Sequence, residues 1–105
     1  MARVCNGNLP IACNLSDPEF QKRRSGLLRE VGAAVIELKE LNDGYGYRFP
    51  ADDRWIAELS KLITAERQCC PFLRFKIDVE PGNGAIWLEL TGPPVTKDFL
   101  NSLFD

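Results

Sequence analysis

Two segments of the chain alternate apolar and polar residues on both sides of a turn sequence, and this pattern restricts the fold more than any other feature. Alternation with a period of two places successive side chains on opposite faces of a β-strand. The pairs Asp43-Gly44 and Asn83-Gly84 favour the tight turns that join antiparallel strands. The sequence therefore predicts two β-hairpins. Their strands are expected at residues 35–41 and 45–49 and at residues 72–79 and 85–91.

A helix is expected before the first hairpin. Ser16 and Glu19 have the spacing of a capping box, in which each side chain accepts a backbone hydrogen bond from the other end of the turn. Leu15 and Phe20 occupy the two positions of a hydrophobic staple around that box. We expect the helix to run to about Val31, and the basic cluster at residues 22–24 to form a solvated face.

A second helix is expected between the hairpins and a third after them. Asp52 or Asp53 can cap the second helix, and Pro71 ends it because proline disfavours helical geometry at the preceding residue. Its apolar stripe consists of Trp55, Leu59, Leu62 and Ile63. The third helix is expected at residues 95–104, with Val95, Phe99, Leu100 and Leu103 as its apolar positions.

The order helix, hairpin, helix, hairpin, helix predicts an α+β fold, with a four-stranded, mainly antiparallel sheet and helices on one face. A chain of 105 residues with 45% hydrophobic residues is large enough for one modest core. We expect an N-terminal arm at residues 1–14 and a single domain at residues 15–105.

Charge and composition exclude several classes of function. The net charge of −2 argues against a nucleic-acid partner, because binding to phosphates depends on Lys and Arg. No run approaches the about 20 apolar residues that span a bilayer, and the first residues lack a secretory signal. We therefore expect a cytoplasmic protein with no membrane partner, whose four cysteines are thiols. The absence of histidine excludes Ser-His-Asp and Cys-His catalysis and histidine-based metal sites.

The segment Glu66 to Leu73, with its adjacent cysteines, is the candidate site. Glu66, Cys69 and Cys70 can converge on one face of the last turn of the second helix, because residues three and four apart are neighbours there. Glu66 continues an apolar stripe, so its carboxylate needs a partner. Arg67, Arg74 and backbone N–H groups are structural candidates, while a metal ion and a neighbouring thiol are functional ones.

Three functions remain open for this segment. The leading hypothesis is a soft metal or metalloid ion, such as Zn(II) or Cu(I), bound by Cys69 and Cys70 with Cys13 and Glu66 as further ligands. The second is a non-enzymatic homodimeric interaction module whose cysteines only fill the core. Its surface is expected on the sheet face opposite the helices, at Tyr45, Tyr47 or Trp87. The third is a thiol redox protein, which needs Lys or Arg near a solvent-accessible sulfur.

Several short motifs together resemble a family of small bacterial proteins with no established activity. The motifs are Cys13-Asn-Leu-Ser16, Asp43-Gly-Tyr-x-x-Arg-Phe-Pro50, Glu66-Arg-x-Cys-Cys-Pro-Phe72, Trp87-Leu-x-Leu-Thr-Gly-Pro93 and Lys97-x-Phe-Leu100. The resemblance runs from about Cys13 to the C-terminus and implies a bacterial origin and one small domain. Cys13, Glu66, Cys69 and Cys70 fall within these motifs, which favours one shared site but names no ligand.

Overall fold

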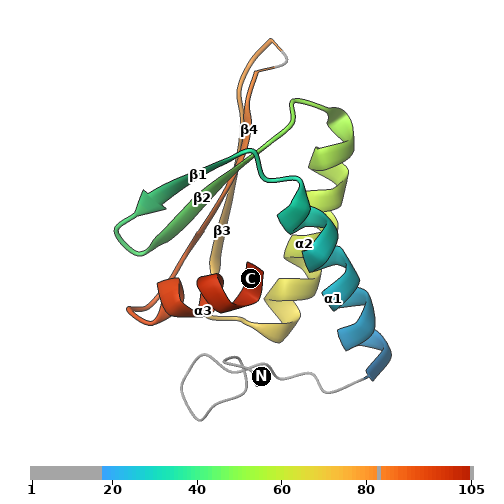
Figure 1. Ribbon diagram of the computed structural model, residues 1–105, viewed down its shortest axis with the longest axis vertical. Helices are drawn as coiled ribbons and strands as arrows, with labels where there is room; N and C mark the ends of the chain where they lie inside the picture. Colours follow the sequence, from blue (N-terminus) through green and yellow to red (C-terminus); the bar gives the residue numbers. More distant parts are fainter. Residues whose placement is uncertain (1–17, 83, 105) are drawn as a thin grey trace.

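A four-stranded antiparallel sheet and three helices form the fold (Figure 1). The structure is a computed structural model that describes residues 18–82 and 84–104. The predicted α+β class and the predicted order of elements are both confirmed. The elements are α1 (Pro18–Ala33), β1 (Glu37–Leu41), β2 (Gly44–Phe49), α2 (Asp53–Cys69), β3 (Arg74–Val79), β4 (Ile86–Thr91) and α3 (Thr96–Phe104).

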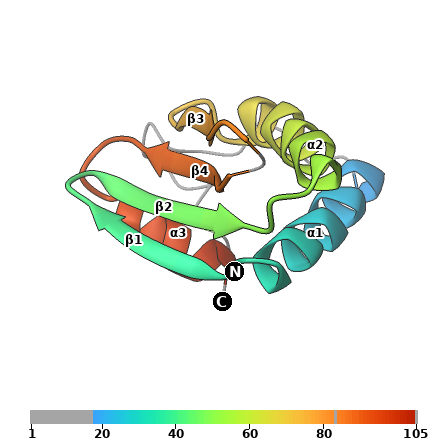
Figure 2. The ribbon, with the colours of Figure 1, turned by 90° about the horizontal axis from the view of Figure 1, so that it is seen from above.

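The two hairpins join through their second strands. The strand order is β1-β2-β4-β3, so β2 and β4 are central while β1 and β3 are the outer strands (Figure 2). Tyr47 on β2 lies opposite Leu38 on β1 and opposite Leu88 on β4. This register continues across the sheet, where Leu88 lies opposite Ile77 on β3. All four side chains therefore belong to one row on one face of the sheet.

The helices cover the face that carries Tyr45, Tyr47 and Phe49. The Tyr45 hydroxyl accepts a hydrogen bond from Asn101 of α3, and the Phe49 ring stacks on Trp55 of α2 with 5.9 Å between centroids. Alternation along β2 places its three aromatic residues on the same face. The expectation that Tyr45 and Tyr47 lie on the face opposite the helices is wrong, because alternation along a strand does not say which face the helices cover.

Trp87 does lie on the opposite face, which is polar. Its neighbours across the strands are Arg48 and Asp78, and the Lys39 ammonium lies 4.7 Å from the centre of its ring. A lone tryptophan among charged residues makes no extended apolar patch. The aromatic docking face expected on this side of the sheet is therefore absent from the described residues.

The second helix has the predicted apolar stripe and the predicted ends. The Asp52 side chain accepts a hydrogen bond from the backbone N–H of Arg54 at its N-terminus. At its C-terminus Cys70 is the cap, and Pro71 follows it. Trp55, Leu59 and Leu62 are buried. None of the helices in residues 18–82 and 84–104 is both long and apolar enough to cross a lipid bilayer.

Gly44 differs from its expected role as a turn residue. It is the first residue of β2, and it pairs with Leu41 and with Thr91. A Cβ atom at this position would lie 1.8 Å from the backbone oxygen of Leu90. Glycine is therefore required here because the β2 backbone approaches β4 closely, and not because of the geometry of the turn.

Candidate functional site

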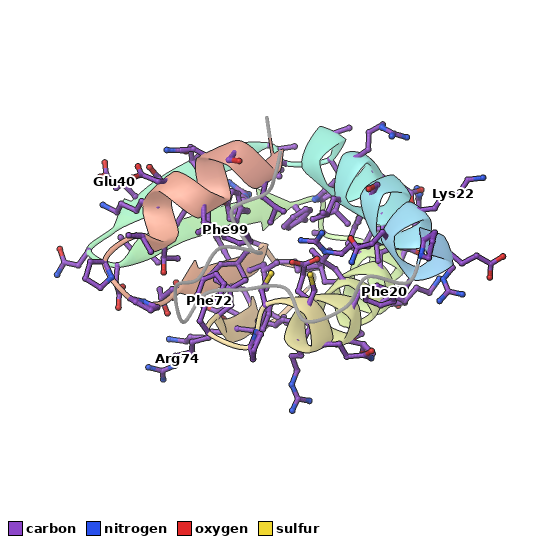
Figure 3. The ribbon with its side chains drawn as sticks, turned by 90° about the horizontal axis from the view of Figure 1, so that it is seen from below. Phe20, Lys22, Glu40, Phe72, Arg74 and Phe99 are labelled. Carbon is purple, nitrogen blue, oxygen red and sulfur yellow. The ribbon has the colours of Figure 1, made fainter. Side chains whose placement is uncertain are left out.

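The expected convergence of Glu66, Cys69 and Cys70 occurs at the end of α2. Glu66 and Cys69 lie three residues apart within the helix, and the backbone N–H of Cys70 donates to the carbonyl of Glu66. The side chain of Glu66 is 1% exposed and both cysteines are 0% exposed. Figure 3 views the molecule from below, with sulfur atoms drawn in yellow. The three residues therefore form one buried cluster.

The partner of Glu66 is Arg24 on α1, 42 residues earlier in the chain. The guanidinium binds both carboxylate oxygens, with 2.5 Å from Nε to Oε2 and 3.1 Å from Nη2 to Oε1. Arg24 is only 5% exposed. The structural partners expected from the sequence, Arg67 and Arg74, are instead exposed. A two-point contact of this kind is the strongest geometry for an arginine and a carboxylate.

The interpretation of residues 22–24 as a solvated face is wrong for Arg24. Lys22 and Arg23 are exposed, and Lys22 points away from the molecule (Figure 3). Arg24, however, follows Phe20 by four residues and precedes Leu28 by four, so it lies on the same helix face as these apolar side chains. This spacing is the sequence signal that identifies a buried arginine within a basic cluster.

The two adjacent cysteines differ in chemical state. Cys69 is disulfide-bonded, whereas Cys70 is not in a disulfide, so the pair is not bonded to itself. The expectation that all four cysteines are thiols does not hold for Cys69. A disulfide joins residues that only the fold brings together, and no local pattern announces it. Cys5 and Cys13 lie outside the described residues, so the expected position of Cys13 beside α2 stays a prediction.

The Cys70 sulfur contacts the same guanidinium that binds Glu66. Arg24 Nη2 lies 4.0 Å from Cys70 Sγ, and Arg24 Nη1 donates to Gln21 Oε1 at 3.3 Å. The guanidinium thus joins α1, the carboxylate and the thiol. The guanidinium that lies beside the Cys70 sulfur is therefore also paired with the Glu66 carboxylate.

A groove between α1 and α2 reaches this guanidinium from the surface. Its volume is about 590 Å³, and Arg24 lines it together with Phe20, Leu27 and Gln68. Arg24 therefore belongs both to the wall of the groove and to the surroundings of the Cys70 thiol. Neither Cys69 nor Cys70 is among the described residues that line the groove.

The proposed metal ligands do not form a complete set within the described residues. No group of three or more Cys, Asp and Glu side chains there has a geometry that could hold a metal ion. The Glu66 carboxylate binds Arg24, and the Cys69 sulfur belongs to a disulfide. A metal site at this cluster therefore requires reduction of Cys69 and at least one ligand from outside residues 18–82 and 84–104.

The arrangement in these ranges is a buried thiol beside a disulfide, with a cation that also neutralises a carboxylate. The segment Glu66 to Phe72 and Arg24 are the parts of the chain that create it. Comparison of this chain with family models, with curated proteins and with solved structures finds no match.

Proposed function

We propose that this protein carries out thiol–disulfide exchange through Cys69 and Cys70. One observation carries the proposal: a thiol and a disulfide lie on successive residues, and the thiol sulfur lies 4.0 Å from the Arg24 guanidinium. Exchange requires a thiolate close to a disulfide, and a cation supports the thiolate. The redox hypothesis asked for a basic side chain near a solvent-accessible sulfur: the basic side chain lies beside the Cys70 sulfur, whereas the sulfur itself is buried.

The exchange step conserves sulfurs and electrons. The Cys70 thiolate attacks the sulfur bonded to Cys69, a new S–S bond forms to Cys70, and Cys69 leaves as a thiolate. The proton lost by Cys70 is taken up by Cys69. An external thiol reacts in the same way, forming a mixed disulfide and releasing one protein thiolate. A second external thiol then completes reduction, and the external reductant leaves as its own disulfide.

Burial determines which reactants this site accepts. Both sulfurs are fully buried, so a large protein substrate has no direct contact with them. The groove between α1 and α2 has the size of a small-molecule pocket and is walled by Arg24. The natural reductant is therefore expected to be a low-molecular-weight thiol that enters this groove.

Differential alkylation under defined thiol–disulfide buffers tests the exchange. The oxidised protein is quenched with acid and alkylated, and the peptide Gln68–Arg74 is fragmented to locate the disulfide. We expect wild type to give disulfides at both Cys69 and Cys70, and Cys69→Ser to form its disulfide at Cys70. Cys70→Ser should keep the Cys69 disulfide and react with added thiol about tenfold more slowly.

Two results would contradict the exchange. One is a disulfide found at Cys69 alone in wild type together with an unchanged rate in Cys70→Ser. The other is a Cys69→Ser protein that forms no disulfide in any buffer. Cys70→Ala is the matched control for the serine variant, because it removes the sulfur without adding a hydroxyl to a buried position.

A soft metal or metalloid ion is the second candidate, and it concerns the reduced protein. Cysteines at successive positions favour it, since reduction would leave sulfur ligands at both Cys69 and Cys70, and the Cys70 sulfur lies beside the Arg24 cation. Cys13 and Glu66 remain the proposed further ligands. Zn(II), Cu(I) and As(III) are the ions whose affinity for sulfur fits such a set.

Native mass spectrometry of the reduced protein tests this candidate. We expect one bound ion per chain, lost in Cys69→Ser/Cys70→Ser and weakened in Cys13→Ser. A reduced wild type that ignores Zn(II), Cu(I) and As(III) would eliminate the metal site. That result would leave the exchange intact, because exchange is measured without metal.

A further inference from the structure

The outer strand β3 presents an unusual set of side chains at an open edge of the sheet. Outer strands carry backbone N–H and C=O groups that point away from the sheet, and proteins commonly protect them or use them for association. The apolar side chains of β3 lie on the helix-covered face, where Val79 is 50% exposed. The opposite face of the strand carries charges, and Arg74 points outward in Figure 3.

The charged residues of this edge have no ion pair within the described part of the chain. They are Arg74, Lys76, Asp78 and Glu80. Two basic residues followed by two acidic residues thus line this edge, with no ion-pair partner among the described residues. Such a sequence is complementary to itself when it is read in the opposite direction.

We propose that the protein forms a homodimer in which β3 pairs antiparallel with β3 of a second copy, with Ile77 on the two-fold axis. In this register Lys76 lies opposite Asp78 of the second copy, and Arg74 lies opposite Glu80. On the other face Ile77 meets Ile77, and Phe75 meets Val79. Every cross-strand pair is then either oppositely charged or apolar, which are the pairs that stabilise antiparallel strands.

Charge makes the neighbouring registers less favourable, because each contains a like-charge contact and only two opposite-charge contacts instead of four. Side chains that lie directly opposite each other in paired strands point to the same face of the sheet. A two-fold axis perpendicular to the sheet must therefore lie midway between two copies of the same residue. With Lys76 on the axis, two lysines oppose each other. With Asp78 on the axis, two aspartates do. Like charges directly opposite are destabilising, so the sequence selects the register centred on Ile77.

The other outer strand fits a second copy less well. Glu37, Lys39 and Glu40 of β1 already form ion pairs with Arg48, Glu89 and Lys97. The Lys97 ammonium lowers the pKa of the Glu40 carboxyl through a hydrogen bond and its charge.

Geometry adds a second difference between the two edges. The best register for β1 places Leu38 on the axis, which sets the exposed Ile36 against Glu40 of the second copy. That register combines one opposite-charge pair with an unfavourable contact between an apolar and an acidic side chain. The β3 edge is therefore the better interface.

Two single charge reversals and their mixture test the register. Lys76→Glu leaves only acidic groups at positions 76 and 78, and Asp78→Lys leaves only basic ones. Each homodimer then opposes like charges twice, so we expect its dissociation constant to rise roughly tenfold or more. An equimolar mixture restores opposite charges at both contacts. We expect the mixture to dimerise within about threefold of wild type.

Sedimentation velocity over a concentration series is the measurement, with circular dichroism to verify that each variant is folded. Leu38→Lys, on the β1 edge, is the control and should leave the dimer unchanged. A wild type that stays monomeric up to its solubility limit overturns the proposal. So does a mixture that associates no better than its components, or a dimer that only Leu38→Lys dissociates.

Discussion

Replacing Arg24 by methionine is expected to lower the free energy of unfolding by about 3–5 kcal/mol, because the substitution leaves the Glu66 carboxylate buried without its cation. This is a large fraction of the about 5–15 kcal/mol that stabilises a typical native domain. Urea denaturation followed by tryptophan fluorescence measures it, because Trp55 is buried beside Phe49. All proteins are compared in the same redox state.

The double variant Arg24→Met/Glu66→Leu separates the loss of a partner from the loss of the pair. Removing both charges also removes the unpaired carboxylate, so its stability should return to within about 1 kcal/mol of wild type or exceed it. Arg23→Met alters an exposed neighbour and should change stability by less than about 0.5 kcal/mol. Equal losses in the single and double variants would show that Arg24 acts by packing alone.

Replacing Gly44 by alanine is expected to lower the free energy of unfolding by about 3 kcal/mol, at the upper end of the range for overpacking. The added Cβ would meet the Leu90 backbone oxygen at 1.8 Å, and no side-chain rotation relieves a contact with backbone. The central strands β2 and β4 would have to separate at this end. Thermal unfolding followed by circular dichroism measures the effect.

Gly26→Ala is the matched control for Gly44→Ala. A Cβ at Gly26 meets no atom within 4 Å, and the residue lies inside α1. Alanine has a higher helix propensity than glycine, so this variant should gain about 0.5–1 kcal/mol. Opposite signs for the two substitutions are expected. A Gly44→Ala protein as stable as wild type would mean that β2 and β4 do not approach as closely as described.

The sequence by itself determined the elements of this fold and the candidate segment. The hairpins follow from alternation around Asp43-Gly44 and Asn83-Gly84, and the end of α2 follows from Pro71. The convergence of Glu66 with the cysteines follows from helical spacing alone. These features depend on residues two to four positions apart, whose geometry is set by the local backbone. The sequence also showed that Glu66 needs a partner.

Tertiary structure alone decided which residues meet across the chain. The partner of Glu66 is 42 residues away, and the disulfide state of Cys69 depends on a contact that no neighbour in the sequence controls. The packing of the helices buried Tyr47 on the covered face, and the strand order made β3 an outer strand. The pairing of β2 with β4 also explains why residue 44 is glycine: its backbone lies in close contact with β4. The physical reason is that local patterns specify each element, while the packing of those elements is chosen by the burial and charge of the whole domain.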